Sequence, residues 1–197
     1  MTFAAIVVGG YLLGSCPWGY WLVRVFRGAD VRKVGSGNIG GSNVWRSYGS
    51  SLGLPVMILD ALKGFTPALI GVHEVSHVCG IAAGAAAMLG HSRPLFLRFA
   101  RGGKMVATGA GAFLAVATWA LLVAAGVWFV VFLATRYASL ASITSAVVIP
   151  VAAWLLGYPV SVIVFAAVAG AGVVFLHRAN VQRLRAGTEH RAQLGRA

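Results

Sequence analysis

The sequence predicts an all-α integral membrane protein of seven transmembrane helices, some of them short, with the N-terminus outside and the C-terminus in the cytoplasm. Three properties of the chain indicate this class. It has 197 residues, of which 59% are hydrophobic and only 10% are charged, and Lys and Arg number 16 against 4 Asp and Glu, a formal net charge of +12. A soluble domain averages about 25% charged residues, and a disordered chain combines high net charge with low hydrophobicity. The composition therefore argues against both classes.

The predicted helices come from five apolar runs, which cover roughly 3–23, 52–72, 78–97, 106–135 and 143–176. A helix needs about 20 residues to cross the hydrocarbon core, so the first three runs are single spans. Residues 2–25 lack the features of a cleavable signal peptide and are expected to be a retained first helix. The last two runs are too long for one span each. Gly157-Tyr158-Pro159 is a turn signal that divides the last run, whereas a division of run 106–135 near 118–120 rests on length alone.

The positions of the basic residues favour seven spans over five. With both long runs divided, every Lys and Arg outside the helices falls on one side of the membrane, whereas five spans would place Arg136 on the other side. The basic side is cytoplasmic by the positive-inside rule. We therefore expect a single domain over residues 1–197, with cytoplasmic loops and a cytoplasmic tail at about 28–50, 92–105, 136–142 and 177–197.

The first cytoplasmic loop is rich in glycine and short polar side chains; its central part reads Gly35-Ser36-Gly37-Asn38-Ile39-Gly40-Gly41-Ser42-Asn43-Val44-Trp45-Arg46. Glycines let successive backbone N–H groups turn toward one anion, and an arginine can bind phosphate in a bidentate manner. The dinucleotide fingerprint would need a preceding strand, and the Walker pattern would need Lys where Gly41 stands. The loop therefore predicts phosphate binding without nucleotide binding.

The second cytoplasmic loop ends in Gly102-Gly103-Lys104 immediately before an apolar helix. Paired glycines let the backbone approach an anion at a helix N-terminus, where the helix dipole favours negative charge. Lys104 would supply a point charge to a phosphate oxygen, or would simply extend to the membrane surface. Asp60 and Lys63 lie three residues apart within the second span. Charges inside a span pair with each other, and both a functional and a purely structural pair remain open.

A competing motif lies on the opposite side of the membrane. His73-Glu74-Val75-Ser76-His77 satisfies H-E-x-x-H, in which two helical histidines bind zinc and the glutamate is the general base. The third ligand of the extended pattern falls at Ala83, which cannot bind a metal. A membrane zinc metalloprotease is one alternative function, and a non-catalytic phosphate or anion transporter is another.

Eight motifs occur in order along the chain: Gly14-Ser15, Asp30-Val31-Arg32, Gly35 to Gly40 with Asn43 and Arg46, Leu59-Asp60-x-x-Lys63-Gly64, Gly90-His91 with Pro94, Gly102-Gly103-Lys104 with Val106-Ala107-Thr108, Ser139 to Ile143, and His177-Arg178-x-Asn180 continuing to Glu189. Together they resemble the motifs of the bacterial membrane acyl-phosphate:glycerol-3-phosphate acyltransferases of the PlsY type. Such proteins have seven helices and an outside N-terminus. Two departures stand out: Met105 occupies a position where the family usually has Gly, and Gly41-Ser42 replaces Ala-Thr.

The resemblance implies acyl transfer from acyl-phosphate to the 1-hydroxyl of glycerol 3-phosphate, forming lysophosphatidic acid and phosphate. It implies catalytic roles for Lys104, Ser36, Arg46, His177 and Asn180 and substrate-binding roles for Gly37, Asn38, Ser42, Asn43, Lys63, His91, Gly102, Gly103, Thr108 and Ser142. A substrate phosphate, His177 or His91 would take the hydroxyl proton. We expect no metal, cofactor or nucleic acid, and membrane lipids as surroundings. The expected form is a monomer in the bacterial inner membrane with its active site facing the cytoplasm.

Overall fold

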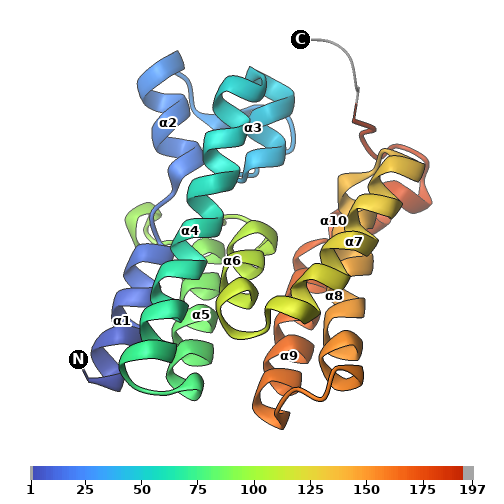
Figure 1. The fold of residues 1–197 in the computed structure, drawn as a ribbon. Helices are drawn as coiled ribbons and strands as arrows, with labels where there is room; N and C mark the ends of the chain where they lie inside the picture. Colours follow the sequence, from blue (N-terminus) through green and yellow to red (C-terminus); the bar gives the residue numbers. More distant parts are fainter. Residues whose placement is uncertain (1, 193–197) are drawn as a thin grey trace. The chain divides into compact units, whose positions relative to one another are not determined.

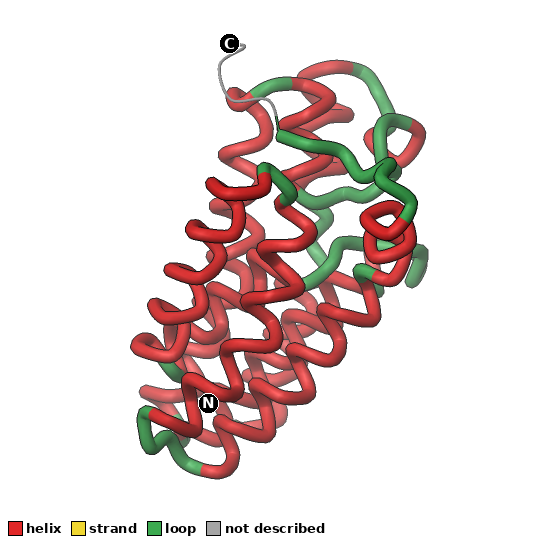
Figure 2. Tube along the Cα trace, turned by 90° about the vertical axis from the view of Figure 1, so that its right-hand side faces the viewer, coloured by secondary structure: helices red, strands yellow, loops and turns green. Residues whose placement is uncertain are grey.

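The computed structural model describes residues 2–192, and this part of the chain is helical without a strand (Figure 2). Its elements are α1 (Phe3–Gly14), α2 (Trp18–Arg27), the 3-10 turn η1 (Val31–Lys33), α3 (Gly41–Tyr48), α4 (Ser50–Glu74), α5 (His77–Ser92), the 3-10 turn η2 (Leu95–Leu97), α6 (Val106–Val116), α7 (Thr118–Thr135), α8 (Ala138–Leu155), α9 (Val160–Leu176) and α10 (Arg178–Arg185). The all-α prediction is confirmed. The contacts divide the chain between Val116 and Ala117 into two units, each described by itself below.

Several helices are suited to a membrane by length and composition. Within residues 2–192, four spans are long and apolar enough to cross it: Phe3–Arg27, Ser50–Glu74, Thr118–Thr135 and Ala138–Leu155. A fifth results if the bent pair α9 and α10 is counted as one span, and α6 is a shorter apolar helix. The predicted divisions of the two long apolar runs are confirmed, because α6 and α7 are separated at Ala117 and α8 and α9 at residues 156–159.

The first predicted helix, residues 2–25, is broken where the sequence analysis expected continuity. α1 ends at Gly14 and α2 begins at Trp18. Pro17 has no N–H to continue the helical ladder, which explains the break. The side chain of Ser15 donates to the carbonyl of Tyr11 at 2.8 Å and so takes part in closing the last turn of α1. At the break the N–H of Cys16 donates to the carbonyl of Leu13 at 3.1 Å, and the carbonyl of Cys16 accepts the N–H of Trp18 at 3.1 Å.

In unit 1, α4 is the central helix and packs against α1, α3, α5 and α6 (Figure 1). The helices approach closely because glycine stands at their contact points. A Cβ at Gly111 of α6 would overlap the carbonyl oxygen of Ala61 in α4, and one at Gly14 of α1 would overlap that of Ala87 in α5. Small residues of this kind let membrane helices pack backbone to backbone, where burial of apolar surface from water contributes little.

The first predicted loop, residues 28–50, is a folded subdomain. It contains η1 and α3, neither of which the sequence analysis foresaw. A cluster of buried apolar side chains lies between α2, this segment and the start of α4, formed by Val23, Val31, Ile39, Val44, Leu52 and Val56. At its surface Asp30 forms an ion pair of 2.6 Å with Arg32. The glycine-rich segment is therefore held on a small core of its own.

Unit 2 is built from α7, α8 and α9, which pack in sequence order. The predicted loop 136–142 is mostly helical, since α8 begins at Ala138. The segment after α10 folds back on the unit: Ala192 N–H donates to the carbonyl of Arg136 at 2.8 Å, and Glu189 is buried against α8 and α10. This return of the chain was not expected from the sequence.

Glu189 joins the C-terminal segment to two helices. Its Oε1 accepts hydrogen bonds from Ser139 at 2.8 Å and Asn180 at 2.7 Å, and its Oε2 accepts one from Arg183 at 2.7 Å. Burial by itself raises the pKa of Glu189, but the three hydrogen bonds and the charge of Arg183 outweigh it and hold the pKa below its ordinary value. The ionised carboxylate is thus the form that the folded unit stabilises.

A Gly111→Ala substitution should destabilise unit 1, because the added methyl group meets the Ala61 carbonyl. Overpacking of this kind costs about 1–3 kcal/mol, and a chain of this size loses roughly 2–4 °C in Tm per kcal/mol. Thermal unfolding in detergent measures the change. Gly126→Ala in α7 is the matched control, because a Cβ there meets no atom within 4 Å, and its Tm should not fall. Equal losses in both variants would contradict the close packing described.

Acidification should remove the stabilising contribution of Glu189. Because the pKa is lower in the folded state, the contribution is present above the ordinary carboxyl pKa and is lost as pH falls through the folded value. Glu189→Gln should lower the free energy of unfolding by about 2 kcal/mol near pH 7 and flatten the dependence of Tm on pH below about pH 5. Asp30→Asn is the exposed comparison: Arg32 lowers the Asp30 pKa to about 2, but a surface ion pair is worth only roughly 0–1 kcal/mol, so this variant should change the profile less than Glu189→Gln. A parallel pH profile for wild type and Glu189→Gln would refute this.

Candidate phosphate-binding and acyl-transfer site

The glycine-rich segment 35–46, called the first glycine loop below, is held in shape by the side chain of Asn43. The side-chain NH2 of this buried residue donates to the carbonyls of Val34 at 3.1 Å and Asn38 at 2.9 Å, and its Oδ1 accepts the N–H of Ser36 at 2.9 Å. Gly35 and Gly37 have φ of 59° and 68°, values that glycine adopts without a steric cost. The expected glycine turns are present. Asn43, which was predicted to bind substrate, directs its amide hydrogens at backbone carbonyls.

Asn38 connects the two glycine loops of unit 1. Its Nδ2 donates to the carbonyl of Gly102 at 3.1 Å, while its Oδ1 accepts the N–H of Gly40 at 2.8 Å. The expectation was that Asn38 would contact phosphate directly; the structure places both ends of its amide in contacts with the protein. This hydrogen bond joins residues 64 positions apart and brings together two loops that no sequence pattern connects.

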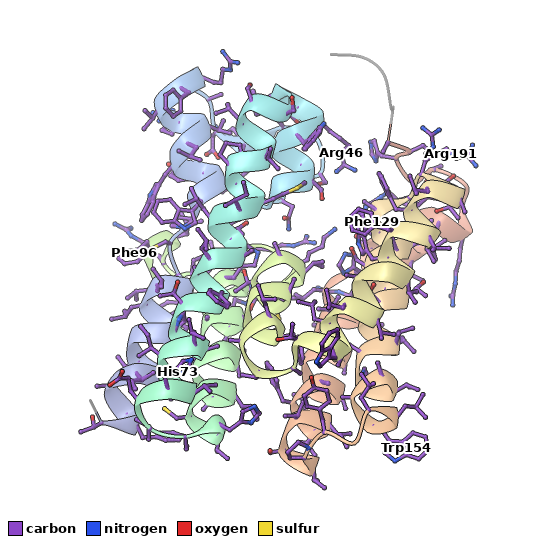
Figure 3. All side chains as sticks on the ribbon, in the orientation of Figure 1. Arg46, His73, Phe96, Phe129, Trp154 and Arg191 are labelled. Atoms are coloured by element: carbon purple, nitrogen blue, oxygen red, sulfur yellow. The ribbon has the colours of Figure 1, made fainter. Side chains whose placement is uncertain are left out.

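The side chains that border these loops are the polar and basic ones the sequence analysis selected. Ser42 and Arg46 are exposed on the first two turns of α3, and Ser36 and Lys104 are partly exposed. Within unit 1, Arg46 lies at the end opposite to His73 (Figure 3). The arrangement presents hydroxyl groups, cations and turned backbone at one end of the unit, which is the chemistry that a phosphate group requires.

The second glycine loop, residues 101–105, packs tightly against the end of α5. A Cβ at Gly102 would overlap the carbonyl of His91, and a Cβ at Gly103 would overlap the imidazole of the same residue. The expected reason for these glycines was approach of the backbone to an anion; packing on His91 is a second reason. Met105 follows Lys104 with φ of 67° and is buried, although a non-glycine side chain disfavours this left-handed conformation.

Asp60, Lys63 and His91 form a buried cluster beneath this loop. Lys63 Nζ lies 2.8 Å from Asp60 Oδ1 and donates to the carbonyl of Cys16 at 2.9 Å. His91 Nδ1 lies 3.6 Å from the same Asp60 oxygen. The expected pairing of Asp60 with Lys63 is confirmed. Lys63 and His91, which were predicted to contact substrate, are exposed by only 2% and 3%.

Thr108 was also expected to contact substrate and lies on the inner face of α6. It is fully buried, and a Cβ at Gly64 of α4 would overlap its carbonyl oxygen. Its Oγ1 has no hydrogen-bond partner among residues 2–192. The first turns of α6 pack against α4, and Thr108 is part of that helix contact.

Unit 2 carries its own polar cluster at one end of its helices. His177 is buried, and its Nδ1 lies 2.8 Å from the carbonyl of Val173; since a carbonyl only accepts, Nδ1 carries the hydrogen and Nε2 of the neutral ring is the acceptor. Asn180 donates to Glu189. Ser142 donates to the Ala138 carbonyl at 2.7 Å and accepts from Trp128 Nε1 at 3.1 Å. In this unit Arg191 and Trp154 lie at opposite ends (Figure 3).

The H-E-x-x-H segment does not have the geometry of a zinc motif. α4 ends at Glu74 and α5 begins at His77, so the two histidines belong to different helices. His77 Nε2 lies 3.0 Å from the carbonyl of Val116. No group of three or more potential ligands among His, Cys, Asp and Glu occurs in the part of the chain described. The zinc motif requires both histidines on one helical face, and the turn at Val75 removes that condition.

The sequence analysis did not assign a role to three residues that support these sites. Glu189 holds Asn180, Cys16 supplies a carbonyl to Lys63, and Trp128 donates to Ser142. Glu189 could have been suspected, because it is one of only four acidic residues in the chain. Nothing in the sequence indicates the Cys16 carbonyl, since any residue has one.

Comparison with known proteins gives consistent matches. A family model described as "Glycerol-3-phosphate acyltransferase" matches residues 4–187. Relatives named glycerol-3-phosphate acyltransferase include one from Desulforamulus reducens, 42% identical over 190 residues with 96% of this chain and 94% of the relative covered. Another, from Rubrobacter xylanophilus, is 46% identical over 192 residues with 97% and 96% covered.

Two solved structures are similar along nearly the whole chain. One is the crystal structure of PlsY, an integral membrane glycerol 3-phosphate acyltransferase, in its glycerol 3-phosphate form, with a TM-score of 0.92, 42% identity and 97% and 96% of the two chains covered. The lysophosphatidic acid form gives a TM-score of 0.89 with 40% identity and 97% and 95% coverage. The chain described above, with its linked glycine loops and apolar helices, belongs to the glycerol-3-phosphate acyltransferase family.

Proposed function

We propose that this protein transfers an acyl group from acyl-phosphate to the 1-hydroxyl of glycerol 3-phosphate and so forms lysophosphatidic acid and inorganic phosphate. The observation that carries the proposal is the pair of glycine loops joined by the Asn38–Gly102 hydrogen bond, with Arg46 and Lys104 beside them, in a member of this family. Both substrates carry phosphate, and the solved relatives are glycerol 3-phosphate and lysophosphatidic acid forms.

In unit 1 we assign the exposed polar groups to the acyl-phosphate. Ser36, Gly37, Ser42 and Arg46 would bind phosphate oxygens through hydroxyl, backbone N–H and guanidinium donors. Lys104 would stabilise negative charge on the acyl-phosphate oxygens and on the carbonyl oxygen as the tetrahedral intermediate forms. Asn38, Asn43, Gly102 and Gly103 would hold the loops in shape, as their hydrogen bonds and packing indicate.

In unit 2 we assign Ser142, His177 and Asn180 to glycerol 3-phosphate. The acceptor Nε2 of His177 is suited to the 1-hydroxyl proton, and Glu189 fixes the amide of Asn180. The hydroxyl oxygen would bond to the acyl carbon, the bond from that carbon to the phosphate oxygen would break, and the proton would go to the departing phosphate or to His177. Because acyl-phosphate is already activated, no covalent enzyme intermediate is required.

We further propose a seven-span topology in the bacterial inner membrane, with the N-terminus outside and the site facing the cytoplasm. The spans would be α1 with α2, then α4, α5, α6, α7, α8 and α9. Support comes from the charges: the turns near His73–His77, Thr118 and Gly157 contain no Lys or Arg, whereas the other connections do.

The direct test is to incubate the purified protein with acyl-phosphate and labelled glycerol 3-phosphate. We expect labelled lysophosphatidic acid without added metal. Lys104→Ala should lower kcat by about 10²–10³-fold, because it removes a charge that acts on the developing oxyanion. Lys33→Ala removes the same charge from an exposed site in η1 and is the control. Near-normal turnover by Lys104→Ala would show that the assigned role is wrong.

Glu74→Gln separates acyl transfer from a metalloprotease. Glu74 is the last residue of α4 and directly follows His73, which lies at the end of unit 1 opposite to Arg46 (Figure 3). The kcat and KM for acyl transfer should therefore stay within about twofold of wild type. The same steady-state assay measures both constants. Loss of activity in this variant, with stoichiometric zinc in the purified protein, would favour the protease. Phosphate flux in liposomes without any acylated product would favour the transporter.

A further inference from the structure

Three ionisable side chains meet inside unit 1 without a part in the chemical steps above. Asp60, Lys63 and His91 are exposed by only 2%, 2% and 3%. Lys63 Nζ is shared between the Asp60 carboxylate and the Cys16 carbonyl, at 2.8 and 2.9 Å. Burying charges in an apolar helix bundle is costly even when they pair, and such residues inside a span mark function by default.

The imidazole of His91 is the surface on which the second glycine loop lies. No side-chain atom fits at Gly103, because a Cβ there would overlap the imidazole ring. The N–H of Gly103 donates to the carbonyl of His91 at 2.9 Å, and that of Gly102 donates to Ser92 at 3.0 Å. The backbone immediately before Lys104 therefore takes its position from the last turn of α5 and from one imidazole ring.

The ion pair lies beside that ring. His91 Nδ1 lies 3.6 Å from Asp60 Oδ1 and has no hydrogen-bond partner among residues 2–192. Asp60 is itself held by Lys63, and Lys63 is anchored to Cys16 between α1 and α2. A continuous series of contacts thus runs from the break after α1, through the ion pair and the imidazole, to the glycine that precedes Lys104.

We propose that Asp60, Lys63 and His91 are positioning residues, which place the Lys104 ammonium group for acyl transfer by fixing the loop 101–105. This inference rests on the proposed function. A purely structural ion pair would stabilise the helices without affecting the loop. The two roles predict different results when these side chains are replaced. If they position the loop, kcat and the hydrogen exchange of the loop change; if they are only structural, the stability of the fold alone changes.

The first test compares His91→Ala with His91→Phe. His91→Ala removes the surface beneath Gly103, so kcat should fall by about 10–100-fold with KM changed less than about twofold. Hydrogen exchange at Gly102 and Gly103 should become faster. His91→Phe keeps a planar ring beneath Gly103 but has no Nδ1 to face Asp60, so it should recover only part of the kcat and of the exchange protection. Cys79→Ala is the control, because Cys79 is fully buried near the other end of α5.

A double variant, Asp60→Asn with Lys63→Met, tests the ion pair without leaving one buried charge alone. We expect a Tm near that of wild type, faster exchange at Gly102 and Gly103, and a kcat lowered about tenfold. Wild-type exchange and kcat in this variant, or values for His91→Ala that match those of Cys79→Ala, would overturn the proposal. If the wild-type protein forms no lysophosphatidic acid, the proposed function fails, and the exchange measurements alone decide this inference.

Discussion

The ammonium group of Lys63 is shared between the carboxylate of Asp60 and the carbonyl of Cys16, deep in unit 1. In apolar surroundings the buried ammonium group requires a counter-charge, which Asp60 provides. The Cys16 carbonyl, which also accepts the N–H of Trp18 at 3.1 Å, is a second acceptor for it. The pair ties the break between α1 and α2 to α4. Because α5 and α6 pack on α4 through glycine contacts, the ends of these helices, where both glycine loops begin or end, take their positions from the same centre.

Most polar side chains near the candidate site form hydrogen bonds with the protein itself and so hold its loops in shape; only some of them lie exposed beside the loops. Asn43 and Asn38 satisfy backbone groups of the first glycine loop and link it to the second. Glu189 does the same in unit 2 for Asn180 and for the returning C-terminal segment. Buried backbone and amide groups need partners where water is scarce, so short amide and carboxylate side chains replace the strand or helix ladder that a loop lacks.

Met105 departs from the family pattern at the turn between Lys104 and α6. The resembled motif usually has glycine after the lysine, and here the residue has φ of 67°, a conformation that glycine adopts freely and that costs other residues about 1–2 kcal/mol. Met105 is nevertheless buried, and its carbonyl accepts the N–H of Gly109 at 2.7 Å in the first turn of α6. The chain therefore retains the turn that places Lys104 before α6 and accepts the steric cost of a side chain there.

The sequence alone determined the helical membrane class, the divisions near residues 118 and 157, and the two basic glycine loops, because composition, turn residues and charge are local properties of the chain. It also indicated the pairing of Asp60 with Lys63, since residues three apart share a helical face. Only the tertiary structure decided that Asn38 spans the two loops, that the His91 ring lies under Gly103, and that Glu189 holds Asn180. Within unit 1 these contacts depend on how α5 packs on α4, and within unit 2 on how the C-terminal segment returns to α8 and α10; no local pattern specifies either.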